Sequence, residues 1–315
     1  MRTEVKANPR QFAPGNPHSS LIPHSSLLFL RIADITIALP GDDSELKMEV
    51  DEVTKNFLVP QAAPDVRVHA RWGDLCEKPG GKKIFDSGLL WRLYSEDRSY
   101  CFHFTSPVLG PLPYKIASFN REFTSGEVCF NHSYFSRTQS LYPLDYPLDE
   151  LLLVNLLARG KGVEVHACGV VDSNGNGHLF VGQSGAGKTT IAKLWQNENG
   201  ATVLSDDRII LRQWGNRLWM YGTPWHGEAE FASPEKAPLK SVYFLAKGIK
   251  NEMIPLKQSD AAALLFARSF PPYYDQQGLE FTLTFLAELV RSIPCYELTF
   301  LPDEKILELI YESDR

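Results

Sequence analysis

The sequence predicts a mixed α/β protein, in which a β-rich N-terminal domain precedes an α/β nucleotide-binding domain with a P-loop. Three observations support this prediction. Short strand-like segments fill the chain from about residue 27 to 142. The pattern changes near residue 147 to alternating helices and strands, and residues 182–189 match a phosphate-binding loop in full. We expect a flexible arm at 1–26, the β-rich domain at 27–145 and the P-loop domain at 146–315.

Length and composition are those of an ordinary globular chain. The 315 residues are 43% hydrophobic and 22% charged, which argues against disorder as the main state. Lys and Arg total 32 against 38 Asp and Glu, so the net charge is −6, and this balance gives no footprint for nucleic acid or an anionic membrane. Five widely spaced cysteines without a CxxC pair favour a reducing compartment. No apolar run reaches the ~20 residues of a membrane span, so we expect a soluble cytoplasmic protein.

The N-terminal region alternates short apolar segments with Gly, Pro, Asp and Ser, as strands and turns do. Residues 1–26 instead hold four prolines and few apolar side chains, which is typical of a flexible arm. The expected strands are Leu27–Leu39, Val66–Trp72, Leu89–Tyr94, Tyr100–Phe104, Tyr114–Phe119 and Glu127–Phe130. We expect the aromatic residues of this region to fill a hydrophobic core.

A helix and a β-hairpin lead into the phosphate loop. Asp149 is placed to cap a helix over Leu151–Ala158, which is apolar on most sides and therefore expected to be buried. The strands Val163–Val171 and His178–Val181 follow, joined by a turn with two Asn-Gly pairs. Nearer the C-terminus we expect helices and a strand over Phe281–Ile293, Tyr296–Phe300 and Pro302–Tyr311, in the order helix, strand, helix.

The most specific motif matches G-x-x-x-x-G-K-[ST] and reads Gly182, Gln183, Ser184, Gly185, Ala186, Gly187, Lys188, Thr189. Glycines let backbone N–H groups wrap a phosphate, and a helix that begins at Lys188 adds the positive end of its dipole. In such a loop the lysine reaches the β- and γ-phosphates, and the hydroxyl of Thr189 is a Mg²⁺ ligand. An apolar strand before the loop and the helical pattern Thr190–Trp195 after it favour this interpretation over an incidental glycine-rich turn.

Two adjacent carboxylates, Asp206 and Asp207, follow a short apolar strand over Ala201–Ser205. P-loop folds hold Mg²⁺ with a carboxylate at the end of such a strand. A second carboxylate can accept a proton from an attacking hydroxyl. The alternative for this segment is a solvated turn. Because only one predicted helix separates the two aspartates from Lys188, we favour a metal-binding or proton-accepting role for them.

His166 and a later loop are further candidates. A hairpin that closes near Asn174–Gly175 places His166 opposite Gln183, at the mouth of the phosphate loop. There it can touch a phosphate, a carboxylate or a metal; the alternative is a satisfied strand histidine. Residues 221–228 include Trp225, His226 and Glu228. This loop is a candidate lining of the acceptor site, and the alternative is a packed Trp in a turn.

Together these segments resemble the HPr kinase/phosphorylase family. The resemblance covers about residues 145–300 and rests on the run from His166 to Val171, the phosphate loop through Thr190, and the run from Leu204 to Ile209. The same order of histidine, loop and paired aspartates is similar to that of phosphoenolpyruvate carboxykinase. The resemblance implies a P-loop domain of this kind, ATP bound by Gly182 to Thr190, and Mg²⁺ held by Thr189 and an aspartate.

The resemblance also implies that Asp206 and Asp207 divide the metal and general-base roles. We expect Asp206 to be the base and Asp207 a metal ligand, with His166 near the γ-phosphate. Thr190 stands where HPr kinase has an acidic residue, and the later Gly-rich segment of that family has no counterpart. HPr itself is therefore not the expected acceptor.

These patterns predict an ATP- and Mg²⁺-dependent kinase that acts on a Ser/Thr-type hydroxyl of a peptide, protein or small metabolite. Two alternatives stay open. One is a non-catalytic ATP-binding module that senses nucleotide or binds peptide, and the other is a bifunctional kinase/phosphorylase. We expect neither nucleic acid nor membrane as a partner, and the resemblance leaves room for a homo-oligomer.

Overall fold

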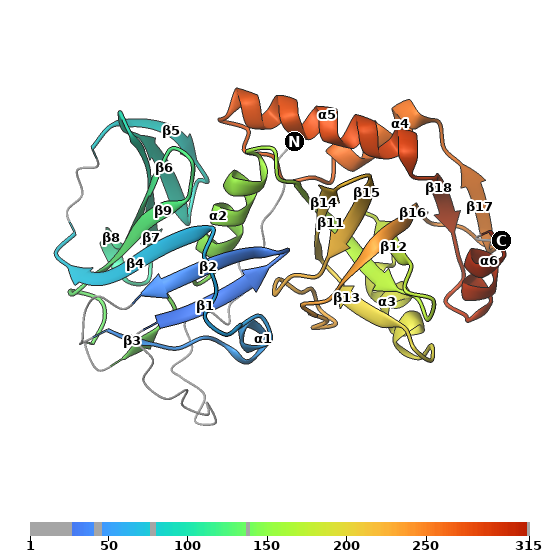
Figure 1. Cartoon of the computed structure of the whole chain (residues 1–315), viewed down its shortest axis with the longest axis horizontal. Helices are drawn as coiled ribbons and strands as arrows, with labels where there is room; N and C mark the ends of the chain where they lie inside the picture. The colour runs from blue at the N-terminus through green and yellow to red at the C-terminus, as the bar shows by residue number, and fades with distance from the viewer. Residues whose placement is uncertain (1–26, 41–45, 76–79, 137–138, 314–315) are drawn as a thin grey trace.

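The computed structural model describes residues 27–40, 46–75, 80–136 and 139–313. The arm expected at 1–26 lies outside these residues, as does Cys76. Two large sheets, a small two-stranded sheet and their attached helices make up the described chain, so the mixed α/β class is confirmed. Figure 1 shows the first sheet in blue to green and the second in yellow-green to red, with helix α2 (Leu148–Leu157) between them in this view.

Eight described strands build the first sheet, in the spatial order β1-β2-β4-β9-β8-β7-β6-β5. Their bounds are β1 Leu27–Ile32, β2 Ile35–Pro40, β4 Val66–Gly73, β5 Lys82–Asp86, β6 Trp91–Ser95, β7 Ser99–Ser106, β8 Gly110–Asn120 and β9 Ser125–Asn131. Strand β4 pairs in parallel with β2 and β9, and β5 to β9 form an antiparallel meander. The smaller elements are β3 (Lys47–Met48), which pairs with β10 (Ser140–Leu141), and α1 (Glu52–Lys55).

The segment expected as one strand over Leu27–Leu39 is instead the β1–β2 hairpin. Ala33 and Asp34 form its turn, with φ of 51° and 56°, and two positive φ values suit the twist of a tight hairpin. This turn lacks glycine, so the usual signal for it is missing from the sequence. The other expected strands correspond to β4, β6, β7, β8 and β9. Three of the aromatic side chains expected in a core are buried there, namely Trp72, Phe102 and Phe104, while Trp91 packs against this core partly buried and Tyr94 is not among its members.

Helix α2 packs in the core of the first sheet, as an expected buried helix should. Its apolar side chains share that core with the strands: Leu148, Leu152, Leu153, Leu156 and Leu157. The predicted cap was wrong, because the helix begins one residue before Asp149, and Pro147 holds the N-cap position. Asp149 is buried and only 5% exposed, and its carboxylate contacts a residue far along the chain.

The second sheet carries the segment of residues 182–189 that matches the phosphate-loop motif. Its described strands are β11 Val163–Val171, β12 Gly177–Val181, β13 Thr202–Ser205, β14 Arg208–Trp214, β15 Arg217–Tyr221, β16 Lys236–Ala246, β17 Glu252–Pro255 and β18 Cys295–Thr299. Strand β11 is central. Its first half pairs with β14, and its second half pairs with β12 on one side and β13 on the other. Strand β12 also pairs in parallel with β16, which pairs in parallel with β18.

Helices cover both faces of this sheet. Helices α4 (Gln258–Phe266) and α5 (Gln276–Ser292) pack on one face, and α3 (Lys188–Gln196) and α6 (Lys305–Ser313) pack on the other. Side chains of β12 alternate between the two cores, since Leu179 and Val181 lie in the first and Phe180 in the second. Within the described ranges, none of the helices is long and apolar enough to cross a membrane. The four described cysteines are buried free thiols.

The β1–β2 turn ties the first sheet to the second. The hydroxyl of Tyr221 donates a 2.9 Å hydrogen bond to Oδ2 of Asp34, and Lys236 forms an ion pair with the same carboxylate. Arg212 donates to the carbonyl of Ala33. Burial alone would raise the pKa of Asp34, but Lys236 and Tyr221 outweigh it and lower that pKa. The two sheets therefore meet through specific polar contacts as well as through α2.

Candidate functional site

The phosphate loop runs from the end of β12 to the first residue of α3. Gly185 and Gly187 adopt left-handed φ values of 78° and 109°, which favour glycine. A Cβ on Gly187 would lie 2.8 Å from the ring of Phe300, whereas a Cβ on Gly185 would meet nothing within 4 Å. Gln183, Ser184 and Gly185 are exposed. The strand, loop and helix thus follow in the expected order, and the crest of the loop faces solvent.

Lys188 lies under this crest. Its Nζ donates to the carbonyls of Gly182 at 3.0 Å and Gln183 at 3.4 Å, and the residue is buried. Burial lowers the pKa of Lys188, and the negative charge of Asp207 opposes that shift. The ammonium and this carboxylate therefore act on each other within one site. Thr189 and Thr190 are half-buried on the next residues of α3.

Asp206 and Asp207 lie where the chain passes from β13 to β14. Both strands pair with β11, and the N–H of Ala167 donates to the carbonyl of Asp207 at 3.1 Å. The two carboxylates therefore stand beside the middle of β11, next to the strand that carries the phosphate loop. Local sequence alone does not reveal this position, because it depends on how β13 and β14 both pair with β11.

The Asp206 carboxylate is engaged on both oxygens. Oδ1 accepts from the N–H of Gly227 at 2.9 Å, and Oδ2 accepts from the N–H of Ala229 at 3.0 Å. The residue is only 2% exposed. Asp206 therefore holds the loop of residues 222–230 against the end of β13.

The Asp207 carboxylate faces two cationic or polar side chains and is partly open. Its Oδ1 lies 2.8 Å from Nε2 of His166, and its Oδ2 accepts from Nη1 of Arg208 at 2.5 Å. Burial by itself would raise the pKa of Asp207, but the His166 hydrogen bond and the Arg208 charge outweigh it and lower the pKa. The side chain is 28% exposed, so of the two aspartates it is the accessible one.

His166 reaches this site in a register one residue away from the expected one. Ala167 pairs with Val181, whereas the alignment of His166 with Gln183 would have paired Ala167 with Gly182. The turn is centred differently because Asp172 accepts hydrogen bonds from the N–H groups of both Asn174 and Asn176. His166 itself lies beside Arg208 in the β11–β14 pair.

Arg208 connects the site to buried carboxylates that sequence reasoning missed. Its Nε donates to Oε1 of Glu150 at 2.8 Å and lies 3.4 Å from Oε1 of Glu164. The guanidinium carbon stands 4.3 Å from the centre of the Phe270 ring. Glu150 is on α2 and Glu164 is on β11, and no short-range signal in the sequence relates them. Burial raises the pKa of Glu164 well above its usual range, and Glu150 adds to that shift.

The loop of residues 222–230 contains the Trp225 that the sequence marked. Trp225 is buried, and its Nε1 donates a 2.7 Å bond to Oδ2 of Asp149. For Trp225 itself, the alternative of a packed Trp in a turn is therefore correct. His226 is half-buried and Glu228 is exposed on the same loop, which is tied to the aspartate pair through Asp206.

The donor set fits Mg²⁺ in composition. Among the described residues, no cluster of three or more His, Cys, Asp or Glu is arranged to hold a metal. Mg²⁺ is usually bound by one or two protein oxygens together with substrate phosphates, so it does not need such a cluster. Thr189 and Asp207 offer a hydroxyl and a carboxylate, which are oxygen ligands of the kind this ion prefers.

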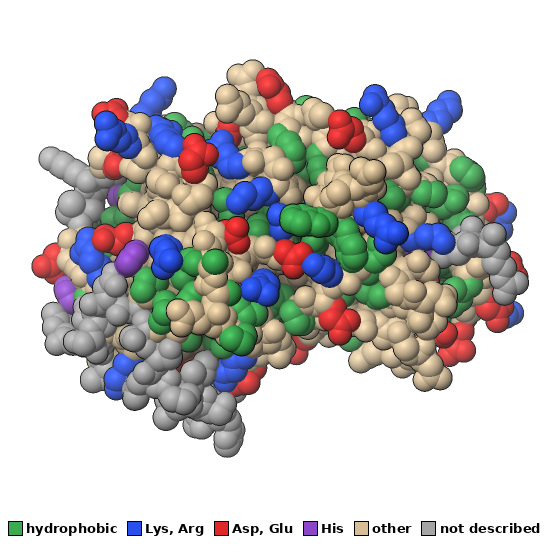
Figure 2. Space-filling view, viewed as in Figure 1, with side chains coloured by type: hydrophobic (Ala, Val, Ile, Leu, Met, Phe, Trp, Pro, Cys, Tyr) green, Lys and Arg blue, Asp and Glu red, His purple; other side chains and the backbone are tan. Residues whose placement is uncertain are grey.

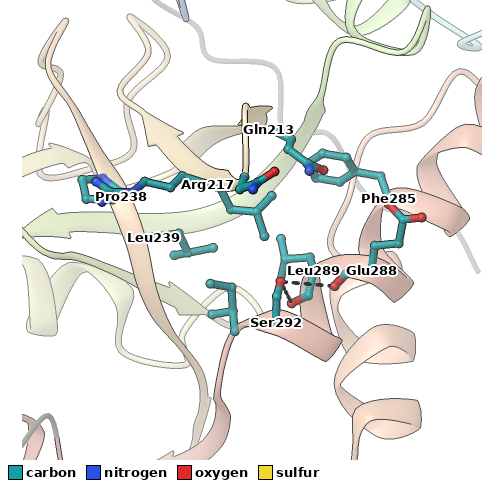
Figure 3. A pocket seen from close by; sticks show the side chains of 11 residues that line it. Gln213, Arg217, Pro238, Leu239, Phe285, Glu288, Leu289 and Ser292 are labelled. Carbon is teal, nitrogen blue, oxygen red and sulfur yellow. Dashed lines mark hydrogen bonds between the residues drawn. The ribbon is translucent and has the colours of Figure 1, made fainter.

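A separate pocket of about 510 Å³ lies between the β14–β15 hairpin, β16 and α5. Figure 3 shows that Phe285 and Leu289 of α5 line one side and that Arg217 and Leu239 come from the sheet. Its lining includes none of the site residues described above. Figure 2 shows Lys or Arg and Asp or Glu side chains interspersed over the viewed face of the molecule.

Comparison with known proteins leaves the family open. No family model matches the chain, and no curated protein matches it. Among solved structures, the chain is similar to the HPr(Ser) kinase/phosphatase from Coxiella burnetii at 17% identity and a TM-score of 0.27, over 46% of this chain and 90% of that one. A likeness of this size establishes neither the family nor the activity, so the resemblance to HPr kinase/phosphorylase stays a prediction.

Proposed function

We propose that this protein is an ATP- and Mg²⁺-dependent phosphotransferase with a Ser/Thr-type hydroxyl acceptor on a peptide, protein or small metabolite. One observation carries the proposal. A complete phosphate loop and the hydrogen-bonded pair of His166 and Asp207 lie in one site, where Lys188 and Asp207 influence each other's pKa. Phosphoryl transfer needs this combination of an anion cradle, a positive charge and a carboxylate.

The proposed roles follow from the contacts. Gly182 to Thr190 would hold the triphosphate, with Lys188 turned from its loop carbonyls toward the β- and γ-phosphates. Thr189 and Asp207 would supply ligands for Mg²⁺, which spreads the phosphate charge when it is bound. Asp206 has both oxygens engaged by backbone N–H groups, so its proposed part is to hold the loop of residues 222–230, in place of the base role first expected.

His166 is the proposed proton acceptor. Its Nε2 is hydrogen-bonded to Asp207, which fixes the ring and leaves Nδ1 to take the proton of the acceptor hydroxyl. In the step, the acceptor oxygen forms a bond to the γ-phosphorus and its proton passes to His166. The bond between the γ-phosphorus and the bridging oxygen breaks, and ADP leaves with the electron pair.

The direct test is transfer of label from γ-labelled ATP, with Mg²⁺, into a fractionated cell extract. We expect label in a peptide, protein or metabolite fraction with the wild-type protein and none with Lys188→Ala. Lys193→Ala changes an exposed lysine of the same helix α3 and should behave as wild type. ATP binding without transfer to any fraction would favour the sensing module, and absence of ATP binding would refute the proposal.

A further inference from the structure

Asp207 is held by a chain of contacts that begins on α2, outside the phosphate-loop region. Glu150 accepts from Nε of Arg208 at 2.8 Å, and Nη1 of Arg208 donates to Oδ2 of Asp207 at 2.5 Å. We infer that Glu150 is a positioning residue for phosphoryl transfer, which acts through Arg208 to set the orientation of the Asp207 carboxylate. This inference rests on the proposed function, which it deepens by one residue.

The geometry leaves Arg208 little freedom. Its side chain is 17% exposed, and Phe270 lies against the guanidinium plane at 4.3 Å. A buried guanidinium needs a partner for its charge, and its fork of donors fixes the direction of each partner. The Nε bond to Glu150 therefore determines where Nη1 points, and Nη1 in turn determines where Oδ2 of Asp207 lies.

Two carboxyl groups approach the same Nε atom, but they are not equivalent. Glu164 lies 3.4 Å away, is fully buried, and neither of its oxygens has a hydrogen-bond partner. Burial raises the pKa of Glu164 well above its usual range, and the neighbouring Glu150 adds to that shift. Glu150 is closer and makes the hydrogen bond. The shorter distance and the hydrogen bond therefore assign the anchoring of Arg208 to Glu150.

This difference provides a matched pair of variants. Glu150→Ala removes the anchor, and we expect turnover of ATP to fall roughly ten- to hundredfold, because a small misplacement of a reacting group has effects of this size. Glu150→Gln keeps an acceptor oxygen and should retain part of the activity. Glu164→Gln keeps the size of a side chain that makes no hydrogen bond to Arg208, so its turnover should stay within about twofold of wild type. Equal losses in Glu150→Gln and Glu164→Gln would overturn the inference.

A double-mutant cycle tests the route through Arg208. If Glu150 acts only by holding this arginine, then Glu150→Ala should have no further effect on turnover in an Arg208→Lys background. The affinity for metal-free ATP should be unchanged in both single variants, since Lys188 and the loop are intact. A Glu150 effect that persists at full size in the Arg208→Lys protein would show that Glu150 acts elsewhere.

A crystal structure of Glu150→Ala makes the test independent of activity. We expect the Arg208 guanidinium to move and its contact with Oδ2 of Asp207 to open beyond hydrogen-bonding distance. An unmoved Asp207 would overturn the positioning role even if turnover fell. Failure of the proposed function would be seen in a different experiment. A wild-type protein that neither binds ATP nor transfers phosphate would refute phosphotransfer, whereas the displacement of Asp207 in Glu150→Ala could still be measured.

Discussion

The indole Nε1 of Trp225 donates a 2.7 Å hydrogen bond to Oδ2 of Asp149, across 76 residues of sequence. Asp149 lies in the first turn of α2 and Trp225 in the loop that Asp206 holds. The N-terminal end of α2 thus reaches the loop beside the candidate phosphate site. The next residue of the same helix, Glu150, reaches the aspartate pair through Arg208.

Trp225→Phe should destabilise the protein by about 1–3 kcal/mol, because Asp149 loses a donor while it stays buried. Equilibrium unfolding in urea would measure the change. Trp214→Phe is a matched control, since Trp214 is 75% exposed at the β14–β15 turn, and it should leave stability unchanged. Equal effects of the two substitutions would show that the hydrogen bond to Asp149 contributes nothing.

The acidity of Asp149 predicts a pH dependence of stability. Burial raises its pKa to about 7, with Glu150 and Asp145 adding to the shift and the Trp225 bond opposing it. A carboxyl that binds its proton more tightly when folded favours the folded state at low pH. The contribution is fully present below about pH 4 and is lost between about pH 4 and pH 7.

Asp149→Asn removes the charge and keeps an oxygen for the indole. We expect this variant to be more stable than wild type at pH 7, by an amount on the order of 2–4 kcal/mol. The two proteins should converge below about pH 4. Thermal or urea unfolding across this range would measure the difference, and parallel curves at all pH values would contradict the raised pKa.

Gly187→Ala should weaken ATP binding and cost about 1–3 kcal/mol of stability, because it combines a left-handed φ of 109° with a Cβ that meets Phe300 at 2.8 Å. Gly175→Ala is the control for φ alone, with φ of 81° and nothing within 4 Å of the added Cβ. Calorimetric titration with ATP should separate them. Unchanged ATP affinity in Gly187→Ala would argue against the binding of ATP phosphates by residues 182–190.

The two aspartates should separate stability from turnover. Asp206→Asn turns one acceptor oxygen into a donor that faces a backbone N–H, so we expect a loss of about 1–3 kcal/mol. Asp207→Asn should lower turnover by roughly 10²–10³-fold, with a smaller effect on unfolding. Urea unfolding would measure the stability of both variants, and steady-state ATP turnover would measure their activity. The reverse pattern would return the reactive role to Asp206.

Much of the fold could be predicted because its signals are local. Strand β4 shows alternating burial that the sequence already displays, and β11 begins and ends at the expected residues. Two errors have physical causes. The Ala33–Asp34 turn contains no glycine, so the sequence does not indicate a turn there. Asp149 was expected to cap a helix but instead accepts a buried hydrogen bond from Trp225.

The candidate site likewise has one part that local sequence predicts and another part that it does not. The phosphate-loop motif could be recognised because its glycines, its lysine and its threonine all lie within eight residues. Arg208 directly follows the two aspartates in the sequence, but its partners Glu150 and Glu164 are separated from it by 58 and 44 positions. No periodicity or spacing links residues that meet only when α2, β11 and β14 pack together.

The sequence by itself determined the mixed α/β class, the order of most elements and the place of the segment that matches the phosphate-loop motif, because backbone preferences and hydrophobic alternation act over a few residues. Only the tertiary structure decided which carboxylate is buried against backbone N–H groups and which is partly exposed beside other side chains. Asp206 and Asp207 are chemically identical neighbours, and they differ because one meets the N–H groups of Gly227 and Ala229 while the other meets His166 and Arg208. Those partners are brought there by strand pairing and by packing of α2, which are non-local.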